Sequence, residues 1–176
     1  MKTLTLLRHA KSSWGDPSQR DFDRPLNARG EKAARAMGRE LRRLGIVFDI
    51  VLASPAARVV GTIAGLREGG CPIAPDYDQR IYLAPARTLL GIVRAADESH
   101  ERLLIVGHNP GMEQLALLLA RGGALREQVA TKYPTGALAE IRSDEPRWRD
   151  LGQGTGTLGR FIRPHDLDPA LGPGRD

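Results

Sequence analysis

The stretch Thr3-Leu4-Thr5-Leu6-Leu7-Arg8-His9 decides the expected fold, because a short apolar segment ends abruptly in a cation and an imidazole. Two later stretches repeat this arrangement. The apolar run 103–106 leads to His108, and the run 49–53 leads to Arg58. Short apolar runs bounded by turn residues are typical of buried strands in a parallel sheet. We therefore expect three parallel strands that carry histidine or arginine just past their carboxyl ends.

Helical patterns alternate with these apolar runs. A helix is expected to begin at Asn27, a good N-cap, and to end near Gly45. Ser54-Pro55 is interpreted as the N-cap and first turn of the next helix. The expected helices span residues 27–44, 54–67, 85–98 and 110–120, and the expected strands span residues 2–7, 48–53, 72–74, 102–106, 136–142 and 157–163. This order predicts a three-layer α/β/α fold with a mainly parallel sheet and an antiparallel edge strand from the late segments.

A chain of 176 residues is long enough for one domain with one core. We find no internal repeat and no linker, and therefore expect a single domain over residues 1–164. The segment 165–176 is rich in Pro, Gly and Asp, and is expected to form a flexible C-terminal tail.

The composition narrows the expected location and partners. No apolar run approaches the ~20 residues of a membrane helix, and the first residues do not form a signal peptide, so we expect a cytoplasmic protein without membrane contact. The formal net charge is +5, but aromatic residues make up only 5% and do not interleave with the cations. Nucleic acid is therefore not an expected partner, whereas an anionic substrate would be attracted. The sequence predicts no oligomeric state.

The expected site uses no metal ion or cofactor. Cys71 is the only thiol, and no HxxxH or CxxC spacing is present. A phosphate-binding Walker loop and a GxGxxG segment after a strand are also missing. Catalytic chemistry, if present, is therefore expected from side chains alone.

The strand ends suggest what those side chains bind. In open α/β sheets, ligands bind in the crevice outside the carboxyl ends of the strands, where Arg8, His9, Arg58 and His108 are expected to meet. Arginine presents a planar donor fork that matches phosphate oxygens. Pro110 is expected to open a helix whose N-terminus also favours an anion. Two imidazoles and two guanidiniums together suit a phosphoryl group.

These segments resemble the histidine phosphatase superfamily, which has the phosphoglycerate mutase-like fold. Leu7-Arg8-His9-Ala10 is similar to the Arg-His signature of that family, and residues 53–58 are similar to its Ser-Pro-x-x-Arg segment. Thr62-Ile63-Ala64 and Val106-Gly107-His108 match two further segments. Residues 8–14, 21–26 and 161–164 resemble most closely the short, insertion-free SixA-like branch of phosphohistidine phosphatases.

The resemblance implies that His9 attacks phosphorus and forms a phosphohistidine intermediate, while Arg8, Arg58 and His108 hold the phosphoryl oxygens. His9 must be neutral to attack, and we expect nearby cations to keep its pKa low.

The general acid is the open assignment. Mutase-like relatives use a glutamate from an inserted region that this chain is too short to contain. The candidates in this sequence are Asp78, followed by Asp16, Asp21 and Asp23.

The absence of a clear general acid affects which kind of bond the site is expected to cleave. An imidazole with a pKa of ~6.5 leaves more easily than an alcohol, so such a site favours cleavage of a P–N bond. We therefore expect a metal-independent phosphatase that acts on phosphohistidine in a protein. A phosphatase for small phosphomonoesters and a non-catalytic phosphate-binding module on the same fold are the alternatives.

Overall fold

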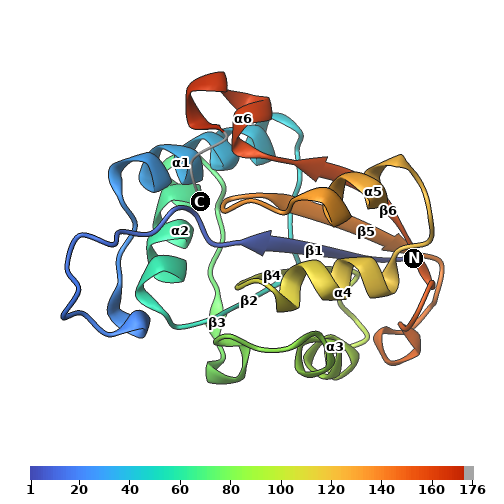
Figure 1. Ribbon diagram of the computed structural model, residues 1–176. Coiled ribbons are helices and arrows are strands. Elements are labelled where there is room, and N and C mark those ends of the chain that lie inside the picture. The colour runs from blue at the N-terminus through green and yellow to red at the C-terminus, as the bar shows by residue number, and fades with distance from the viewer. Residues whose placement is uncertain (173–176) are drawn as a thin grey trace.

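The computed structural model describes residues 1–172. Within these residues the chain forms a six-stranded sheet in the order β3-β2-β4-β1-β5-β6 (Figure 1). The strands are β1 (Lys2–Arg8), β2 (Ile50–Ala53), β3 (Asp76–Tyr77), β4 (Arg102–Gly107), β5 (Leu138–Ser143) and β6 (Gly156–Ile162). The three apolar runs singled out in the sequence are thus the neighbouring strands β2, β4 and β1.

The sheet is mainly parallel. Strands β3, β2, β4 and β1 run in one direction, and Val106 of β4 lies level with both Leu7 of β1 and Ala53 of β2. Strand β5 is antiparallel to β1 and to β6. The expected antiparallel element is therefore present, but it lies one strand inside the edge, and the edge strand β6 runs in the same direction as β1.

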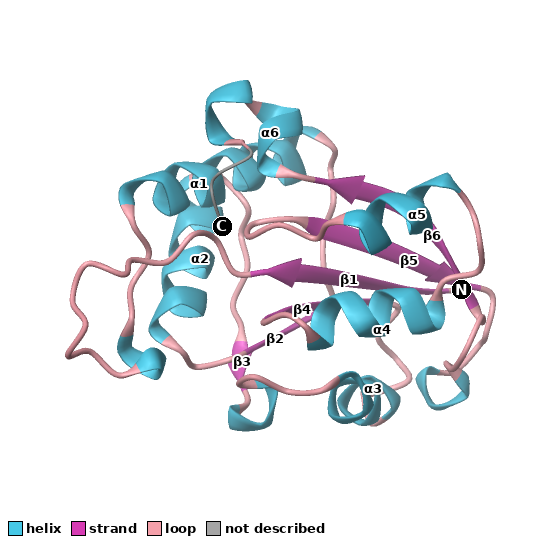
Figure 2. Cartoon of the chain, viewed as in Figure 1, coloured by secondary structure: helices cyan, strands magenta, loops and turns pink. Residues whose placement is uncertain are grey.

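Helices cover both faces of the sheet, as Figure 2 shows. They are α1 (Ala28–Arg43), α2 (Ala57–Glu68), α3 (Ala86–Arg94), α4 (Gly111–Leu119), α5 (Ala124–Thr131) and α6 (Pro164–Leu167). One core cluster joins α1 and α2 to one face of the sheet, and a second joins α3, α4 and α5 to the other. This arrangement confirms the expected α/β/α architecture of the phosphoglycerate mutase-like type.

Several expected elements differ from the observed ones. The strand expected at residues 72–74 is wrong, because Ile73 packs into the core without pairing and the short strand β3 follows it. Helix α3 ends at Arg94, four residues before the expected end. Helix α5 was missed, because only Val129 among its residues is buried and the apolar pattern is correspondingly weak.

The start of α2 also differs, and the difference bears on the site. Ser54 was expected to be the N-cap, but the helix begins at Ala57 with Ala56 as its N-cap. The Ser54 hydroxyl lies instead 2.8 Å from Nε2 of His108. A side chain interpreted as a helix signal therefore contacts a histidine at the neighbouring strand end.

The described segment after β6 packs against α1. Helix α6 and a 3₁₀ turn over Pro169–Leu171 occupy part of the segment expected to be a flexible tail. Leu171 is buried against Ala33 and Ala36 of α1. Residues 173–176 lie outside the described residues. Among residues 1–172, no helix has the length and apolar character needed to cross a membrane.

Candidate active site

The strand ends bring the predicted side chains to one edge of the sheet. Arg8 is the last residue of β1, and the His9 amide donates to the Gly107 carbonyl of β4 at 3.0 Å. The ring centroids of His9 and His108 are 5.3 Å apart. Arg58, in the first turn of α2, donates from Nε to Nε2 of His9 at 3.3 Å. We refer to Arg8, His9, Arg58 and His108 as the histidine cluster.

The contacts of His9 define its protonation state. Its Nδ1 lies 2.7 Å from the Ala10 carbonyl, which can only accept a hydrogen bond, so Nδ1 carries the proton. Nε2 then holds the lone pair, in agreement with its position as acceptor from Arg58. His9 is 7% exposed. It is therefore a buried neutral imidazole whose unprotonated atom, Nε2, faces the guanidinium of Arg58.

His108 contacts Ser54 through one of its ring nitrogens. The Ser54 hydroxyl oxygen lies 2.8 Å from Nε2 of His108 and accepts from the Ala56 amide at 3.3 Å. A hydroxyl both donates and accepts, so this contact fits either tautomer of the ring. Among the described residues, the other ring nitrogen, Nδ1, is buried and has no hydrogen-bond partner. In the tautomer that carries its proton on Nδ1, this nitrogen is a buried donor that suits an anionic ligand.

Burial is the main reason that both rings are neutral. It lowers the pKa of His9 to about 3, against an opposing hydrogen bond to Ala10 and with further lowering by His108 and Arg58. Burial also lowers the pKa of His108 to about 3, with a smaller contribution from Arg58. The sequence-based hypothesis attributed a low His9 pKa to nearby cations. Those cations contribute, but removal of the ring from water contributes more.

Asp21 holds the guanidinium of Arg58. Its carboxylate accepts from Arg58 Nη2 at 3.0 Å, and its backbone carbonyl accepts from Nη1 at 2.8 Å. The same carboxylate accepts from the Tyr82 hydroxyl and pairs with Arg24 at 3.1 Å. Burial raises the pKa of Asp21, but the hydrogen bonds from Tyr82 and Arg58 outweigh it, so that the pKa lies below its usual value. Asp21 is therefore ionised at neutral pH.

The other candidate carboxylates are engaged elsewhere. Asp78 was the first choice from the sequence, but its carboxylate accepts hydrogen bonds from Arg80 and caps the turn that follows β3. Asp16 bonds to Ser18, and Asp23 bonds to Arg20. Of the four acidic candidates, only Asp21 contacts Arg58 in the part of the chain that the structure describes.

An aromatic wall that the sequence did not suggest closes one side. Tyr82 packs edge-on against His108 with ring centroids 5.3 Å apart, and Phe22 packs edge-on against Tyr82 at 5.1 Å. Phe22 lies within the 3₁₀ turn Asp21–Asp23, and Tyr82 directly follows the 3₁₀ turn Gln79–Ile81. No strand-end spacing marks them, so only the folded chain reveals their position.

The backbone after β1 is fixed by close packing. The Ala10 amide donates to the Thr62 hydroxyl at 2.9 Å, and that hydroxyl donates to the Arg58 carbonyl at 2.7 Å. Thr62 thus connects the segment after His9 to the helix that carries Arg58. A Cβ atom at Gly30 would lie 2.1 Å from the Lys11 carbonyl, so only glycine permits α1 to approach this closely.

The described residues contain no group of three or more His, Cys, Asp or Glu side chains arranged to hold a metal ion. The cations of the cluster are guanidiniums. The arrangement can therefore bind an anion, offer a neutral imidazole nitrogen to it, and stabilise negative charge that develops during transfer.

Comparison with known proteins identifies the class. The sequence profile of the histidine phosphatase superfamily (branch 1) matches residues 4–80. The uncharacterised protein Rv1276c of Mycobacterium tuberculosis is 33% identical over 162 residues, which cover 90% of this chain and 99% of that protein. The chain belongs to the histidine phosphatase superfamily. Membership of this family supports the conclusion that the protein is a hydrolase.

Solved structures place it more finely within that class. The SixA protein of Nakamurella multipartitia matches with a TM-score of 0.82 and 29% identity, over 93% of this chain and 96% of that one. The protein histidine phosphatase SixA complexed with tungstate matches with a TM-score of 0.76 and 21% identity, over 94% and 99% of the two chains, which shows the shared fold. The chain is a member of the SixA-like branch.

Proposed function

We propose that this protein is a metal-independent phosphatase that removes the phosphoryl group from phosphohistidine in proteins. The observation that carries the proposal is the state of His9, a buried neutral imidazole whose Nε2 lone pair faces Arg58. A neutral ring nitrogen is a competent nucleophile, and the positive charge beside it suits a phosphoryl group.

The proposed reaction has two steps. Nε2 of His9 forms a bond to phosphorus as the P–N bond of the substrate breaks, and the substrate ring, already protonated by solvent on its other nitrogen, leaves as neutral imidazole with the electron pair of the broken bond. Water then attacks the phosphorylated His9, which releases inorganic phosphate and restores the neutral ring. During both steps Arg8 and Arg58 offset the charge on the phosphoryl oxygens, and His108, in the tautomer that carries its proton on Nδ1, donates to one of them.

The carboxylate near the nucleophile supports P–N cleavage over P–O cleavage. An alcohol needs a protonated acid to leave, and Asp21 is ionised and paired with Arg58 and Tyr82. Imidazole, with a pKa near ~6.5, leaves without such an acid, whereas phenol has a pKa near ~10. The relatives described as SixA phosphatases, one of them named a protein histidine phosphatase, agree with this substrate class.

The test compares a phosphohistidine peptide with phenyl phosphate in the presence of EDTA. We expect kcat/KM for the peptide to exceed that for phenyl phosphate by at least about tenfold, because the leaving group is the better one. Equal or faster turnover of phenyl phosphate would favour a small-molecule phosphatase instead. Tight phosphate binding without turnover of either compound would identify a binding module and contradict the proposed activity.

A further inference from the structure

Exposed apolar side chains gather at the edge of the sheet that carries the histidine cluster. Among the described residues, the large apolar side chains exposed to solvent are Met1, Trp14, Val47, Val60, Tyr77 and Leu83. Met1 and Val47 precede strands, whereas the other four lie at or beyond the carboxyl ends of β1, β2 and β3. In Figure 1 the loop after β1, drawn in blue, lies on the side toward which the β1 arrow points. Apolar side chains that gather in this way indicate a contact surface.

Trp14 is held against a residue that belongs to the site. It is 74% exposed, and its ring stacks on the guanidinium of Arg24, whose Cζ lies 3.4 Å from the ring centroid. Arg24 is itself buried and pairs with Asp21 at 3.1 Å, and Asp21 in turn holds Arg58. The stacking on a buried cation fixes the tryptophan ring. A fixed, exposed tryptophan is the kind of side chain that contributes most to protein contacts, because little conformational entropy is lost on binding.

Leu83 adjoins the cluster through Tyr82. It directly follows Tyr82 in the chain, and the Tyr82 ring packs edge-on against His108 at 5.3 Å. The Leu83 side chain is 54% exposed. Within residues 1–172, Leu83 is the only residue other than glycine with a positive φ, 51°, which costs free energy because Cβ crowds the backbone. Strained backbone of this kind occurs at ligand-binding sites, and here it presents an apolar side chain to solvent.

Asp21 connects the two exposed side chains, which we refer to as the apolar rim. The Asp21 carboxylate pairs with Arg24, on which Trp14 stacks. It also accepts a hydrogen bond from Tyr82, the residue before Leu83. The Asp21 side chain is 45% exposed, whereas both imidazoles of the cluster are buried. A substrate whose phosphoryl group reaches the cluster therefore keeps its remaining atoms near this exposed row.

The length of that row limits what can cover the apolar rim. The side chains that stand between Trp14 and Leu83 are those of Arg24, Asp21 and Tyr82. A leaving group the size of one ring covers only part of the row. A polypeptide extends by about 3.3 Å per residue on each side of a phosphorylated histidine, and its neighbouring side chains can reach both ends. The apolar rim therefore suits a polypeptide with apolar residues that flank the phosphohistidine.

We propose that the apolar rim docks the polypeptide that carries the phosphohistidine, through apolar residues on either side of the modified histidine. The occupant is the substrate protein itself, because the rim is continuous with the site that takes the phosphoryl group. This assignment rests on the proposed function. Trp14 and Leu83 touch none of the reacting atoms, so they determine specificity and are not catalytic residues.

The first experiment compares two phosphohistidine peptides of equal length and charge, in which the modified histidine is flanked by leucine or by serine. We expect kcat/KM of the unmodified protein to be about fivefold to tenfold higher for the leucine peptide, mainly through a lower KM. Trp14→Ala and Leu83→Gly should each reduce this preference to less than about threefold. Glycine adopts a positive φ without strain, so the loss in Leu83→Gly reports the side chain and not the backbone.

Phosphohistidine as a free amino acid is the control for the cluster, because it carries no flanking residues. Its kcat/KM should stay within about twofold in both variants. Val47→Ala alters an exposed apolar residue that precedes β2, and it should keep the full preference for the leucine peptide. Equal turnover of the two peptides by the unmodified protein would overturn the docking surface. An equal loss for the leucine peptide and the free amino acid in Trp14→Ala would also overturn it, because Trp14 would then act on the cluster through Arg24.

The second experiment measures binding without turnover. Leucine and serine peptides that carry a stable phosphonate analogue of phosphohistidine are titrated into the protein while tryptophan fluorescence is recorded. Trp14 is exposed and Trp148 is fully buried, so a blue shift of the emission reports burial of Trp14. We expect a saturable shift with a Kd at least about fivefold lower for the leucine peptide, and no shift in Trp14→Phe.

The two experiments fail in different ways. A difference in Kd without hydrolysis of either phosphohistidine peptide would contradict the proposed function and leave the docking surface in place. Hydrolysis of both peptides with equal Kd values would overturn the docking surface and leave the proposed function in place. A blue shift that follows protein concentration and dimer formation in the ultracentrifuge would assign the apolar rim to a second copy of the chain, which also overturns docking of the substrate.

Discussion

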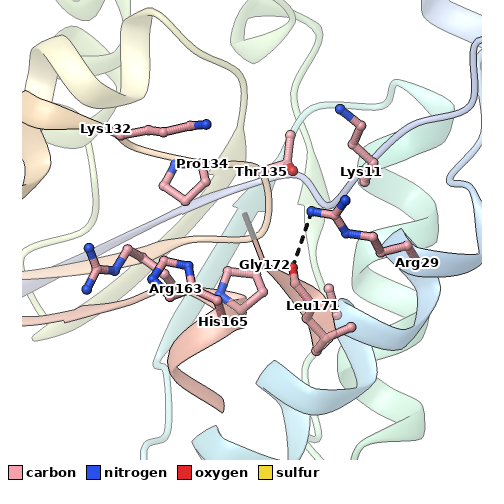
Figure 3. Close-up of a pocket in the computed structure, with 11 residues that line it drawn as sticks. Lys11, Arg29, Lys132, Pro134, Thr135, Arg163, His165, Leu171 and Gly172 are labelled. Carbon is pink, nitrogen blue, oxygen red and sulfur yellow. Dashed lines mark hydrogen bonds between the residues drawn. The ribbon is translucent and has the colours of Figure 1, made fainter. Parts of the chain in front are cut away.

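The histidine cluster and the cavity beside it, which Arg29, Arg163 and other side chains line (Figure 3), lie at the same edge of the sheet but differ in how deeply their charged groups are buried. In the cluster, burial keeps His9 and His108 neutral, and Arg58 is paired with a carboxylate. In the cavity, Arg163 is paired with Asp166 at 3.1 Å, and Arg29 donates to the Leu171 carbonyl at 3.3 Å. The cluster thus holds buried neutral rings, whereas half-buried guanidiniums line the cavity.

The difference follows from burial. A ring nitrogen that attacks must be unprotonated, and burial keeps His9 in that state at any pH well above its pKa of about 3. Cations close to water keep their charge at little cost. The chain therefore places the buried rings and the half-buried cations on the two sides of β1.

The change with the largest expected effect is His9→Ala, which removes the proposed nucleophile from the cluster. This removal is expected to lower kcat by at least about 10³-fold and to abolish labelling of the enzyme by a ³²P-phosphohistidine peptide. His100→Gln, at the opposite edge of the sheet, is the control. Retention of phosphoenzyme in His9→Ala would show that another residue accepts the phosphoryl group.

The next effect concerns the shape of the cation in the cluster. Arg58 contacts His9 and both the backbone and the side chain of Asp21 through three different nitrogens. Arg58→Lys keeps the charge but removes the planar fork, and kcat/KM is expected to fall by about 10²-fold. Arg39→Lys on the surface of α1 is the matched control. A loss of less than about threefold would mean that charge alone suffices in the cluster.

The pH dependence of the free energy of unfolding tests whether burial lowers the pKa of His108 in the folded protein. The folded pKa of His108, about 3, lies below its unfolded value of ~6.5, so only the unfolded chain takes up a proton between these values. The stabilising contribution is complete above pH 6.5 and is lost as the pH falls below it, by about 1.4 kcal/mol per pH unit.

Urea denaturation at pH 7 and pH 5 measures this loss. The free energy of unfolding should fall by roughly 2 kcal/mol less in His108→Gln than in the unmodified protein over that interval. Equal losses in the two proteins would show that His108 titrates normally when folded.

The strand ends could be predicted because the signals are local. The three apolar runs end at Leu7, Ala53 and Val106. The register between neighbouring strands places these last residues level with one another. Because parallel strands place their carboxyl ends side by side, the pattern in the sequence is enough to predict that the residues after these ends lie close together in space. The position of His9, Arg58 and His108 at one sheet edge follows from that geometry.

The position of Asp21 and Tyr82 could not be predicted in the same way. Both lie in segments without periodicity, and tertiary packing alone brings Asp21 to Arg58 across 37 residues of sequence. Asp78 was the first candidate for the general acid from the sequence, but its neighbour Arg80 engages it locally. The cause of the low histidine pKa was also misjudged, because burial is a property of the folded chain and not of spacing.

The smallest expected effect comes from removing the carboxylate that pairs with Arg58. Asp21→Asn removes the negative charge beside Arg58 and leaves a side chain of the same shape. A phosphate dianion then meets no carboxylate at the guanidinium, so inhibition by inorganic phosphate should strengthen by about threefold to fivefold. Asp16→Asn, in the same loop but with its side chain bonded to Ser18, should leave the inhibition constant unchanged. Weaker inhibition in Asp21→Asn would mean that the carboxylate orients Arg58 for the ligand, so that its role in the cluster is to position the guanidinium and not to offset its charge.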